Sequence, residues 1–399
     1  MRSLLPVCSF LMLMALFSCN ADSGSSPEAA TVVTDTFDFK PNPQEMPARE
    51  VPVMALGSEL PDFKLPGADG RYYQRSDFQD AKATLIIFTC NHCPTAQAYE
   101  ERIKDIAEEY GPKGVATIGV SPNSPVGLLY EELGYTDLND DYEAMVIRAR
   151  DHQFNFPYLY DGDDHAFSMK LGPVATPHVF LFDADKKLVY QGRLDSLEKP
   201  GAAHAEDIRL AMDELLAGKP LSRPETKTFG CSTKWAWKTE YRTQVQEKWN
   251  KQAVALQQAD VNKVKALIRN EDSKKLRLIN VWATWCGPCI IEYPEFIAMQ
   301  RMYGARDFEF VSLSADKPEQ EAKALQFLQK EHSGVANYIF TGKDNYALIE
   351  AVDPNWNGAL PYTILVEPGG KVVYAHQGSV APLDVKRAIV EHPMIGRYY

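Results

Sequence analysis

LRLINVWATWCGPCIIEYP, residues 276–294, is the stretch from which the fold can be worked out. It opens with a short, mostly apolar run of the kind found in strands that are buried on both faces. Gly287 and Pro288 then suit a tight turn into a helix, because Gly has no side chain to clash and Pro at the first helical turn loses no donor that the helix needs. The stretch therefore predicts a strand, a turn and a helix, with Cys286 and Cys289 at the start of that helix.

Cys286 and Cys289 predict a redox site. Two cysteines three positions apart at a helix start share one helical turn, so their sulfurs can meet. The free backbone N–H groups and the dipole of that helix end stabilise a thiolate on Cys286. Because the thiolate is the attacking species in disulfide exchange, we expect Cys286 to attack and Cys289 to resolve the mixed disulfide that results.

Two other uses of a C-x-x-C pattern fit the chain poorly. A zinc site of this kind has its second cysteine pair within ~15–20 residues, whereas the only other pair, Cys90 and Cys93, lies far upstream. Covalent haem attachment needs a His directly after the second cysteine, and Pro94 and Ile290 stand there. We therefore expect no metal ion and no cofactor.

The motif WATWCGPC, followed by Glu292 and Pro294, resembles the TlpA/ResA-like branch of the thioredoxin superfamily. In that family the proline corresponding to Pro361 is cis and faces the two sulfurs, and the resemblance implies that the Leu360 backbone is held against a partner peptide. It also marks Trp285, directly before the first cysteine, as a residue that tunes the site. The likeness continues in FEFVSLSAD, residues 308–316, and WNGALPYTILVEPGGKVVY, residues 356–374.

The first half of the chain repeats the same order of elements. LGSELPDFKLPGADGRYYQRSDFQDAKATLIIFTCNHCP, residues 56–94, predicts an entry hairpin with Gly70 at its turn, a buried strand over residues 83–88, and then Cys90 and Cys93. ATPHVFLFDADKKLVYQGRLD, residues 175–195, matches ALPYTILVEPGGKVVYAHQG, residues 359–378.

This internal repeat decides the predicted fold class. Thr176 and Pro177 hold the positions of Leu360 and Pro361, so they are the corresponding candidates for binding a substrate in the first half. Alternating strands and helices make each half an α/β unit. We therefore predict two tandem thioredoxin-like domains, each a mixed β-sheet flanked by helices, joined by a helical linker.

The first half also resembles peroxiredoxin-like redoxin domains, which are related to AhpC/TSA proteins. The resemblance rests on FTCNHCP, ATPHVFLFD and FGCSTKW, residues 229–235. The P-x-x-x-T-x-x-C pattern of the peroxidatic cysteine in true peroxiredoxins is missing, so peroxidase activity stays an alternative. Cys231 lies in the last of these stretches, and two roles stay open for it: resolving a mixed disulfide, or an inert buried thiol.

Proton transfer at the two sites needs a group other than the one thioredoxin uses. Thioredoxin carries a buried Asp six residues before its first cysteine, and here Thr84 and Asn280 stand at those positions. Neither side chain is a base. Proton transfer is then left to water, to Glu292 in the second half, or to His92 between the cysteines of the first. Glu292 and His92 are the candidates that tune the sites, although a solvated helix residue is the alternative for Glu292.

Residues 236–260 predict the helical linker. Apolar residues recur at a helical spacing that favours a core-facing stripe, and Asp260 is the expected N-cap of a following helix. The positions of this stripe are Tyr241, Val245, Trp249, Ala253 and Leu256.

The N-terminus predicts export. Residues 1–19 combine one positive charge with a short apolar run, as in a signal peptide, and end in LFSC, which resembles a bacterial lipobox with Cys19 as the lipidated residue. Phe17 departs from the small or aliphatic residue usual there, and a short membrane anchor is the alternative. Residues 20–50 read as a flexible linker, which leaves residues 51–235 and 261–399 for the two domains.

These features predict an envelope thiol-disulfide oxidoreductase, periplasmic and lipid-anchored to a bacterial membrane. Its expected partners are protein thiols and disulfides and an electron donor or acceptor, and the net charge of −12 argues against nucleic acid. Cys90 and Cys286 are the expected attacking thiols, with Cys93 and Cys289 resolving. The alternatives are a peroxidase fused to its own reductant and a non-catalytic binding or scaffold protein.

Overall fold

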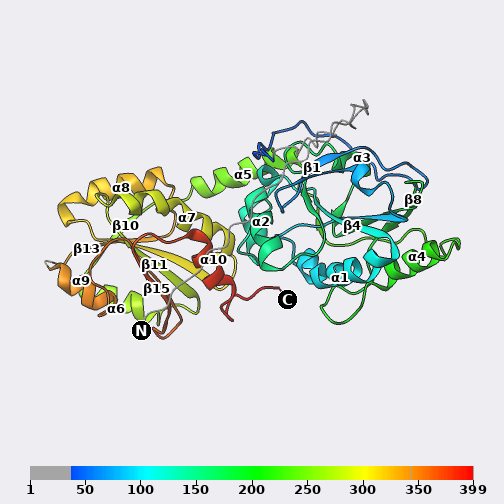
Figure 1. The fold of residues 1–399 in the computed structure, drawn as a ribbon. Helices are drawn as coiled ribbons and strands as arrows, with labels where there is room; N and C mark the ends of the chain where they lie inside the picture. Colours follow the sequence, from blue (N-terminus) through cyan, green and yellow to red (C-terminus); the bar gives the residue numbers. More distant parts are fainter. Residues whose placement is uncertain (1–36, 343, 399) are drawn as a thin grey trace, which may run out of the picture. The chain divides into compact units, whose positions relative to one another are not determined.

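The computed structural model of the chain describes residues 37–342 and 344–398. The predicted signal peptide, Cys19 and the first part of the flexible linker lie outside the described residues. Residues from Phe37 onward form one compact unit. The first half of this unit is coloured blue to green in Figure 1 and the second half yellow-green to red, and each half is built on a β-sheet of its own.

The sheet of the first half has five strands in the order β5-β4-β3-β7-β8. β3, β4 and β5 run parallel, while β7 and β8 join antiparallel. The predicted entry hairpin is present as β1 and β2. The strands are β1 Lys64–Pro66, β2 Tyr72–Gln74, β3 Ala83–Phe88, β4 Val115–Ser121, β5 Tyr158–Tyr160, β6 Ala175–Thr176, β7 His178–Phe182, β8 Leu188–Gly192 and β9 Cys231–Ser232. The helices are α1 Pro94–Tyr110, α2 Tyr142–Asp151, α3 Ser168–Leu171 and α4 Glu206–Leu216.

The second half holds a six-stranded mixed sheet in the order β10-β13-β12-β11-β14-β15. Its strands are β10 Leu256–Ala259, β11 Leu276–Trp282, β12 Phe308–Ser314, β13 Ala336–Phe340, β14 Tyr362–Val366 and β15 Val372–Gln377. Its helices are α6 Val261–Arg269, α7 Gly287–Tyr303, α8 Glu321–Lys330, α9 Asn345–Val352 and α10 Pro382–Val390. Short 3₁₀ helices lie at Arg75–Phe78, Gly111–Lys113, Pro125–Gly127, Tyr130–Leu133, Ala236–Lys238 and Pro318–Gln320.

The two strands that precede the cysteine pairs are buried on both faces. In β3, Leu85 and Ile87 join one apolar cluster, while Ile86 and Phe88 join another on the opposite face. β11 divides in the same way between two clusters of the second half. Because successive side chains of a strand point to opposite faces, a continuous apolar run needs a layer on each side. These layers confirm the predicted fold class of mixed sheets flanked by helices.

The helical linker over residues 236–260 is the part of the prediction that the structure corrects. The helix α5, Thr239–Asn250, stops before the last two positions of the proposed stripe, none of its residues is buried, and Tyr241 is 58% exposed. Of the stripe, Leu256 packs against the core of the second half, but from a strand and not from this helix. Leu256–Ala259 is a strand that pairs in parallel with β13, so the second domain begins before residue 261. Without this segment, the edge of β13 would expose unpaired N–H and C=O groups. Pairing with Leu256–Ala259 satisfies these groups, whereas an exposed helix in the same place would leave them open.

Asp260 caps a helix as predicted. Its side chain accepts a hydrogen bond of 2.8 Å from the backbone N–H of Lys263, in the first turn of α6. In the part of the chain that the structure describes, no helix has the length and apolar character needed to cross a membrane.

Candidate redox sites

The second half carries a disulfide between Cys286 and Cys289, with the Cα atoms 5.3 Å apart. Cys286 is the N-cap of α7, and its sulfur accepts a hydrogen bond of 3.3 Å from the Cys289 backbone N–H. Cys286 is 6% exposed and Cys289 is fully buried. Of the two cysteines, Cys286 is therefore the one nearer to solvent.

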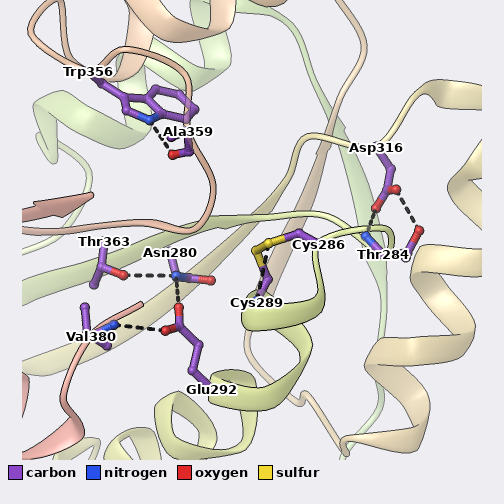
Figure 2. The surroundings of a disulfide bond; sticks show 10 residues. All are labelled: Asn280, Thr284, Cys286, Cys289, Glu292, Asp316, Trp356, Ala359, Thr363 and Val380. Carbon is purple, nitrogen blue, oxygen red and sulfur yellow. Dashed lines mark hydrogen bonds between the residues drawn. A yellow bond between two sulfur atoms is a disulfide. The ribbon is translucent and has the colours of Figure 1, made fainter. Parts of the chain in front are cut away.

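The loop that presents Cys286 is held by an aspartate that the sequence did not point to. Asp316 follows β12 and accepts hydrogen bonds from the backbone N–H and the hydroxyl of Thr284, at 2.9 and 2.7 Å. The Ser314 hydroxyl donates a further bond of 2.8 Å to Asp316. Figure 2 shows the Asp316–Thr284 pair beside the disulfide. These bonds join the turn before α7 to the end of the neighbouring strand.

Glu292 is a buried carboxyl rather than a solvated helix residue. Burial raises its pKa to about 7, against partly opposing hydrogen bonds from the Val380 backbone N–H at 3.1 Å and the Asn280 amide at 3.4 Å. Asn280 also donates to the Thr363 hydroxyl at 3.0 Å. In Figure 2, Glu292 points from α7 towards Asn280 and Val380. A carboxyl that titrates near neutral pH can accept a proton and release it again.

Both candidate prolines follow cis peptide bonds, Thr176–Pro177 and Leu360–Pro361, as the resemblance implied for Pro361. Leu360 packs against the apolar cluster that contains Cys286 and Cys289. The loop before it is held by a hydrogen bond of 2.8 Å from the Trp356 indole N–H to the Ala359 carbonyl, which Figure 2 also shows.

In the first half, Cys90 and Cys93 are free thiols, and both are buried. The Cys90 sulfur lies 3.1 Å from the Thr176 hydroxyl, and the Cys93 thiol donates to the Thr176 carbonyl at 3.3 Å. Cys93 is the N-cap of α1. The fold thus brings Thr176, which precedes Pro177, against both sulfurs of the first pair.

His92 is paired with a buried aspartate, Asp140, that the sequence did not point to either. Their side chains approach to 2.5 Å, and the His92 Nδ1 atom lies 3.6 Å from the Cys90 sulfur. Asp140 also accepts hydrogen bonds from the Asn91 and His92 backbone N–H groups, each 2.9 Å, and from the Asn123 amide at 2.7 Å.

The two groups stabilise each other's charge. Burial opposes ionisation of both, but the charge of Asp140 outweighs it and raises the pKa of His92, while His92 lowers the pKa of Asp140. The charge that His92 carries between the two cysteines is therefore largely compensated by a carboxylate.

The pKa values of the two thiols run opposite to the roles expected for them. Burial raises the pKa of Cys90 well above its usual range, and its hydrogen bond with Cys93 and the charge of Asp140 add to this. Burial also opposes a Cys93 thiolate, but hydrogen bonds from the Cys231 and Cys90 thiols and the charge of His92 hold the pKa of Cys93 well below its usual range. These surroundings favour Cys93, not Cys90, as the thiolate.

Cys231 completes a group of three sulfurs. It is partly exposed, it packs against the cluster of Cys90, Cys93 and Ala96, and its backbone N–H donates to the Cys93 sulfur at 3.4 Å. Burial and a hydrogen bond to Cys93 raise the pKa of Cys231, with the bond the larger cause. Cys231 is thus partly exposed and in contact with the cysteine pair, and its role in resolving a mixed disulfide stays a prediction.

Cys90, His92 and Asp140 also bring possible metal ligands within 4.8 Å of one another. The 2.5 Å between His92 and Asp140 is a hydrogen-bond distance. Nitrogen and oxygen ligands each sit about 2 Å from a zinc ion in a tetrahedral site, which keeps them roughly 3 Å apart. The arrangement therefore suits a shared proton better than a shared ion.

Each half combines a thioredoxin-like fold with two cysteines at a helix start and a cis-proline segment, which defines the class as a tandem thioredoxin-like protein. The chain belongs to the Redoxin family, which matches residues 55–206 and 250–389.

Three proteins with similar sequences or structures show how much of the chain the similarity covers. A DsbE homolog from Paracoccus denitrificans (strain Pd 1222), a thiol:disulfide interchange protein, is 29% identical over 27% of this chain and 54% of its own length. The thiol-disulfide oxidoreductase ResA of Geobacillus thermodenitrificans is 25% identical over 27% of this chain and 58% of its own. An uncharacterized conserved protein from Geobacillus kaustophilus, known from a crystal structure, is 34% identical over 48% of this chain and 97% of its own, with a TM-score of 0.41. The chain thus spans about half the length of these two curated relatives.

Proposed function

We propose that the protein is a thiol-disulfide oxidoreductase that exchanges disulfides with protein substrates. The observation that carries the proposal is the disulfide at the N-terminus of α7, in which Cys286 is 6% exposed and Cys289 is fully buried. The activities named for the Paracoccus and Geobacillus thermodenitrificans relatives support it. Because the cysteines carry the electrons themselves, the proposal includes no cofactor.

The reaction divides between three side chains of the second domain. In the reducing direction, the Cys286 thiolate attacks a substrate disulfide and one substrate thiolate leaves. Cys289 then attacks the Cys286 sulfur, which releases the second substrate thiolate and restores the disulfide. The Glu292 carboxylate, buried on the same helix, accepts the proton that Cys289 loses.

The surface beside Cys286 suits an extended, partly apolar protein segment. Trp285 is 63% exposed and Ile291 is 81% exposed on either side of the cysteine pair. In the described residues no backbone hydrogen bond engages Leu360, so its N–H and C=O groups are free to pair with a partner strand. Side-chain contact and backbone pairing together give the site a way to hold a peptide while sulfurs exchange.

Trapping tests this function directly. Cys289→Ser removes the resolving thiol, so a substrate attacked by Cys286 should stay attached as a mixed disulfide that gels resolve under non-reducing conditions and mass spectrometry identifies. The matched control is the double variant Cys286→Ser/Cys289→Ser, which keeps the fold but has no sulfur at the site. Equal capture by both variants, or no capture by either, contradicts the proposal.

A peroxidase is the second candidate, and one arrangement favours it. The thiolate-stabilised Cys93 at the start of α1 has His92 nearby as a proton donor and two further thiols within reach. Attack of Cys93 on a peroxide would release water, with the proton from His92, and leave a sulfenic acid that a neighbouring thiol condenses with. Consumption of hydrogen peroxide that is lost in Cys90→Ser and Cys93→Ser supports this candidate, and no consumption by the wild type excludes it.

The location is part of the proposal. The signal-like residues 1–19 and the lipobox-like LFSC ending at Cys19 support an exported, lipid-anchored envelope protein. In an oxidising envelope, dithiol sites such as these have disulfides to act on. The physiological donor or acceptor of electrons is then a further thiol protein or a small thiol.

A further inference from the structure

Residues 228–233 lie along the segment that precedes Pro177 in the first domain. In antiparallel register, Cys231 stands opposite Thr176 and Ser232 opposite Ala175. Further bonds flank this pairing: the Thr228 hydroxyl donates to the Pro177 carbonyl at 2.9 Å, and the Thr233 hydroxyl donates to the Pro173 carbonyl at 2.7 Å. The chain therefore lays a strand of its own on this segment.

Gly230 shows how close that approach is. A Cβ atom at this position would lie 2.1 Å from the Thr176 carbonyl oxygen, and the residue has a φ of +134°. Any side chain would have to displace the backbone next to the cysteine pair, so glycine is required here. The tight fit indicates a segment built for this position.

The second domain leaves the equivalent position open. Leu360 corresponds to Thr176 in the internal repeat, and in the described residues its backbone has no hydrogen-bonding partner. The first domain thus fills with its own chain a position that the second domain, under the proposed function, offers to a partner peptide. The residue that this internal strand places beside the sulfurs is a cysteine.

Cys93 is the central sulfur of the three. Cys93 shares a buried cluster with Cys90, and it also contacts Cys231, whose backbone N–H lies 3.4 Å from the Cys93 sulfur. Cys90 and Cys93 are buried, whereas Cys231 is partly exposed. Of the three thiols, Cys231 is therefore the one that an external thiol or disulfide meets first.

We propose that residues 228–233 act as a built-in peptide substrate and that Cys93 alternates between a disulfide with Cys90 and a disulfide with Cys231. This inference rests on the proposed function only for the supply of disulfides that oxidise the first pair. It makes the first domain a three-thiol relay between a buried pair and a surface thiol.

The exchange conserves atoms and electrons. In a Cys90–Cys93 disulfide, Cys93 no longer makes the thiol hydrogen bond that is the larger cause of the raised pKa of Cys231. The Cys231 thiol then loses its proton and attacks the Cys93 sulfur, the new Cys93–Cys231 bond forms, and the Cys90–Cys93 bond breaks. Cys90 leaves as a thiolate and takes up the proton that Cys231 lost, with His92, 3.6 Å from Cys90, placed to pass it on. Two external thiols then reduce the Cys93–Cys231 disulfide, or an external disulfide forms it.

Disulfide mapping tests the relay in the full-length chain. Cys286→Ser/Cys289→Ser silences the second site, and oxidised glutathione serves as the disulfide. Trypsin leaves Cys90 and Cys93 together on residues 83–102 and Cys231 on residues 228–234, so a link to Cys231 joins two peptides. With Cys90→Ala added we expect the two peptides to be linked after oxidation, and with Cys93→Ala at least tenfold less linkage. No linkage in the Cys90→Ala chain, or equal linkage in both, overturns the proposal.

A glycine pair tests the internal strand separately. Gly230→Ala should displace residues 228–233, lower the yield of the linked peptides and raise the rate of Cys93 alkylation at least tenfold. Gly218→Ala is the matched control, because Gly218 also has a positive φ but a Cβ there meets nothing within 4 Å. Parent-like alkylation and linkage in Gly230→Ala overturn the proposal. Linkage without any protein-disulfide exchange by the wild type would instead remove the proposed function and leave the relay standing.

Discussion

Glu292→Gln separates the proton chemistry of the buried carboxyl from its packing. Gln has nearly the same size but cannot ionise. Its carbonyl can accept from the Val380 N–H as Glu292 does. Because the Asn280 Nδ2 group faces the Glu292 carboxylate, the Asn280 amide has to turn over, so that its Oδ1 atom, which has no partner among the described residues, accepts from the Gln amide and from the Thr363 hydroxyl. The substitution should therefore change charge and proton affinity while leaving the fold in place.

The size of the effect follows from the pKa of Glu292, which burial raises from 4.5 to about 7. A pKa shift of this size changes the free energy of unfolding by at most about 3 kcal/mol. Because Glu292 is partly screened by solvent, about half of that should remain. Because the folded pKa lies above the unfolded one, the stability contributed by the neutral carboxyl is fully present below pH 4.5 and is lost as the pH rises through 7. We expect Glu292→Gln to be more stable than the wild type at pH 8, and this advantage to vanish at pH 4.

At pH 8, where we expect Glu292→Gln to be more stable than the wild type, we expect it to be less active. If Glu292 accepts the Cys289 proton, the wild-type rate of disulfide reduction rises as the pH passes through about 7. The variant should lose that inflection, and its rate at pH 8 should fall by about a hundredfold, the size expected for a missing general base.

Urea unfolding at pH 4 and pH 8, and turnover of a protein disulfide from pH 5 to 9, measure the two effects. Glu295→Gln is the matched control, because Glu295 lies one turn further along α7 and makes a half-exposed ion pair with Lys386 at 3.2 Å. The reasoning is refuted if Glu292→Gln keeps the wild-type inflection, or if its stability relative to the wild type is the same at both pH values.

Three further predictions follow from the sequence and the structure. Cys19→Ala should leave the protein unprocessed or soluble in a bacterial envelope fractionation, and a wild type found entirely in the soluble fraction, without an acyl mass on Cys19, contradicts the lipid anchor. A fragment from residue 251 onward should fold and exchange disulfides alone, whereas one from residue 261 lacks β10 and should unfold at lower urea; equal midpoints would show that β10 is dispensable. The third prediction concerns His92→Asn in a chain that also carries Cys286→Ser and Cys289→Ser. Because Asp140 already compensates the imidazolium, the substitution should make the Cys90–Cys93 disulfide a weaker oxidant by about 30 mV or less. Equilibration against glutathione measures the reduction potential, and a change of about 60 mV or more contradicts the compensation.

Local signals in the sequence were enough to predict the two domains and both cysteine pairs. A continuous apolar run marks a buried strand, Gly and Pro mark the turn, and Asp260 marks a helix start, all within a few residues of the structure they determine. The helix proposed through Leu256 shows where this reasoning stops. Whether Leu256–Ala259 forms a strand depends on the free edge of β13, which lies far along the chain.

Contacts between distant residues were decided only by the tertiary structure. Asp140 neutralises His92, Asp316 holds the turn before Cys286, and Val380 donates to Glu292, although no spacing in the sequence links these residues. The same holds for Cys231, whose place opposite Thr176 depends on strand pairing across the first domain. The sequence alone pointed to the cysteine pairs as the candidates for redox chemistry. Their protonation, exposure and partners depend on burial and charge, which arise only when remote parts of the chain pack together.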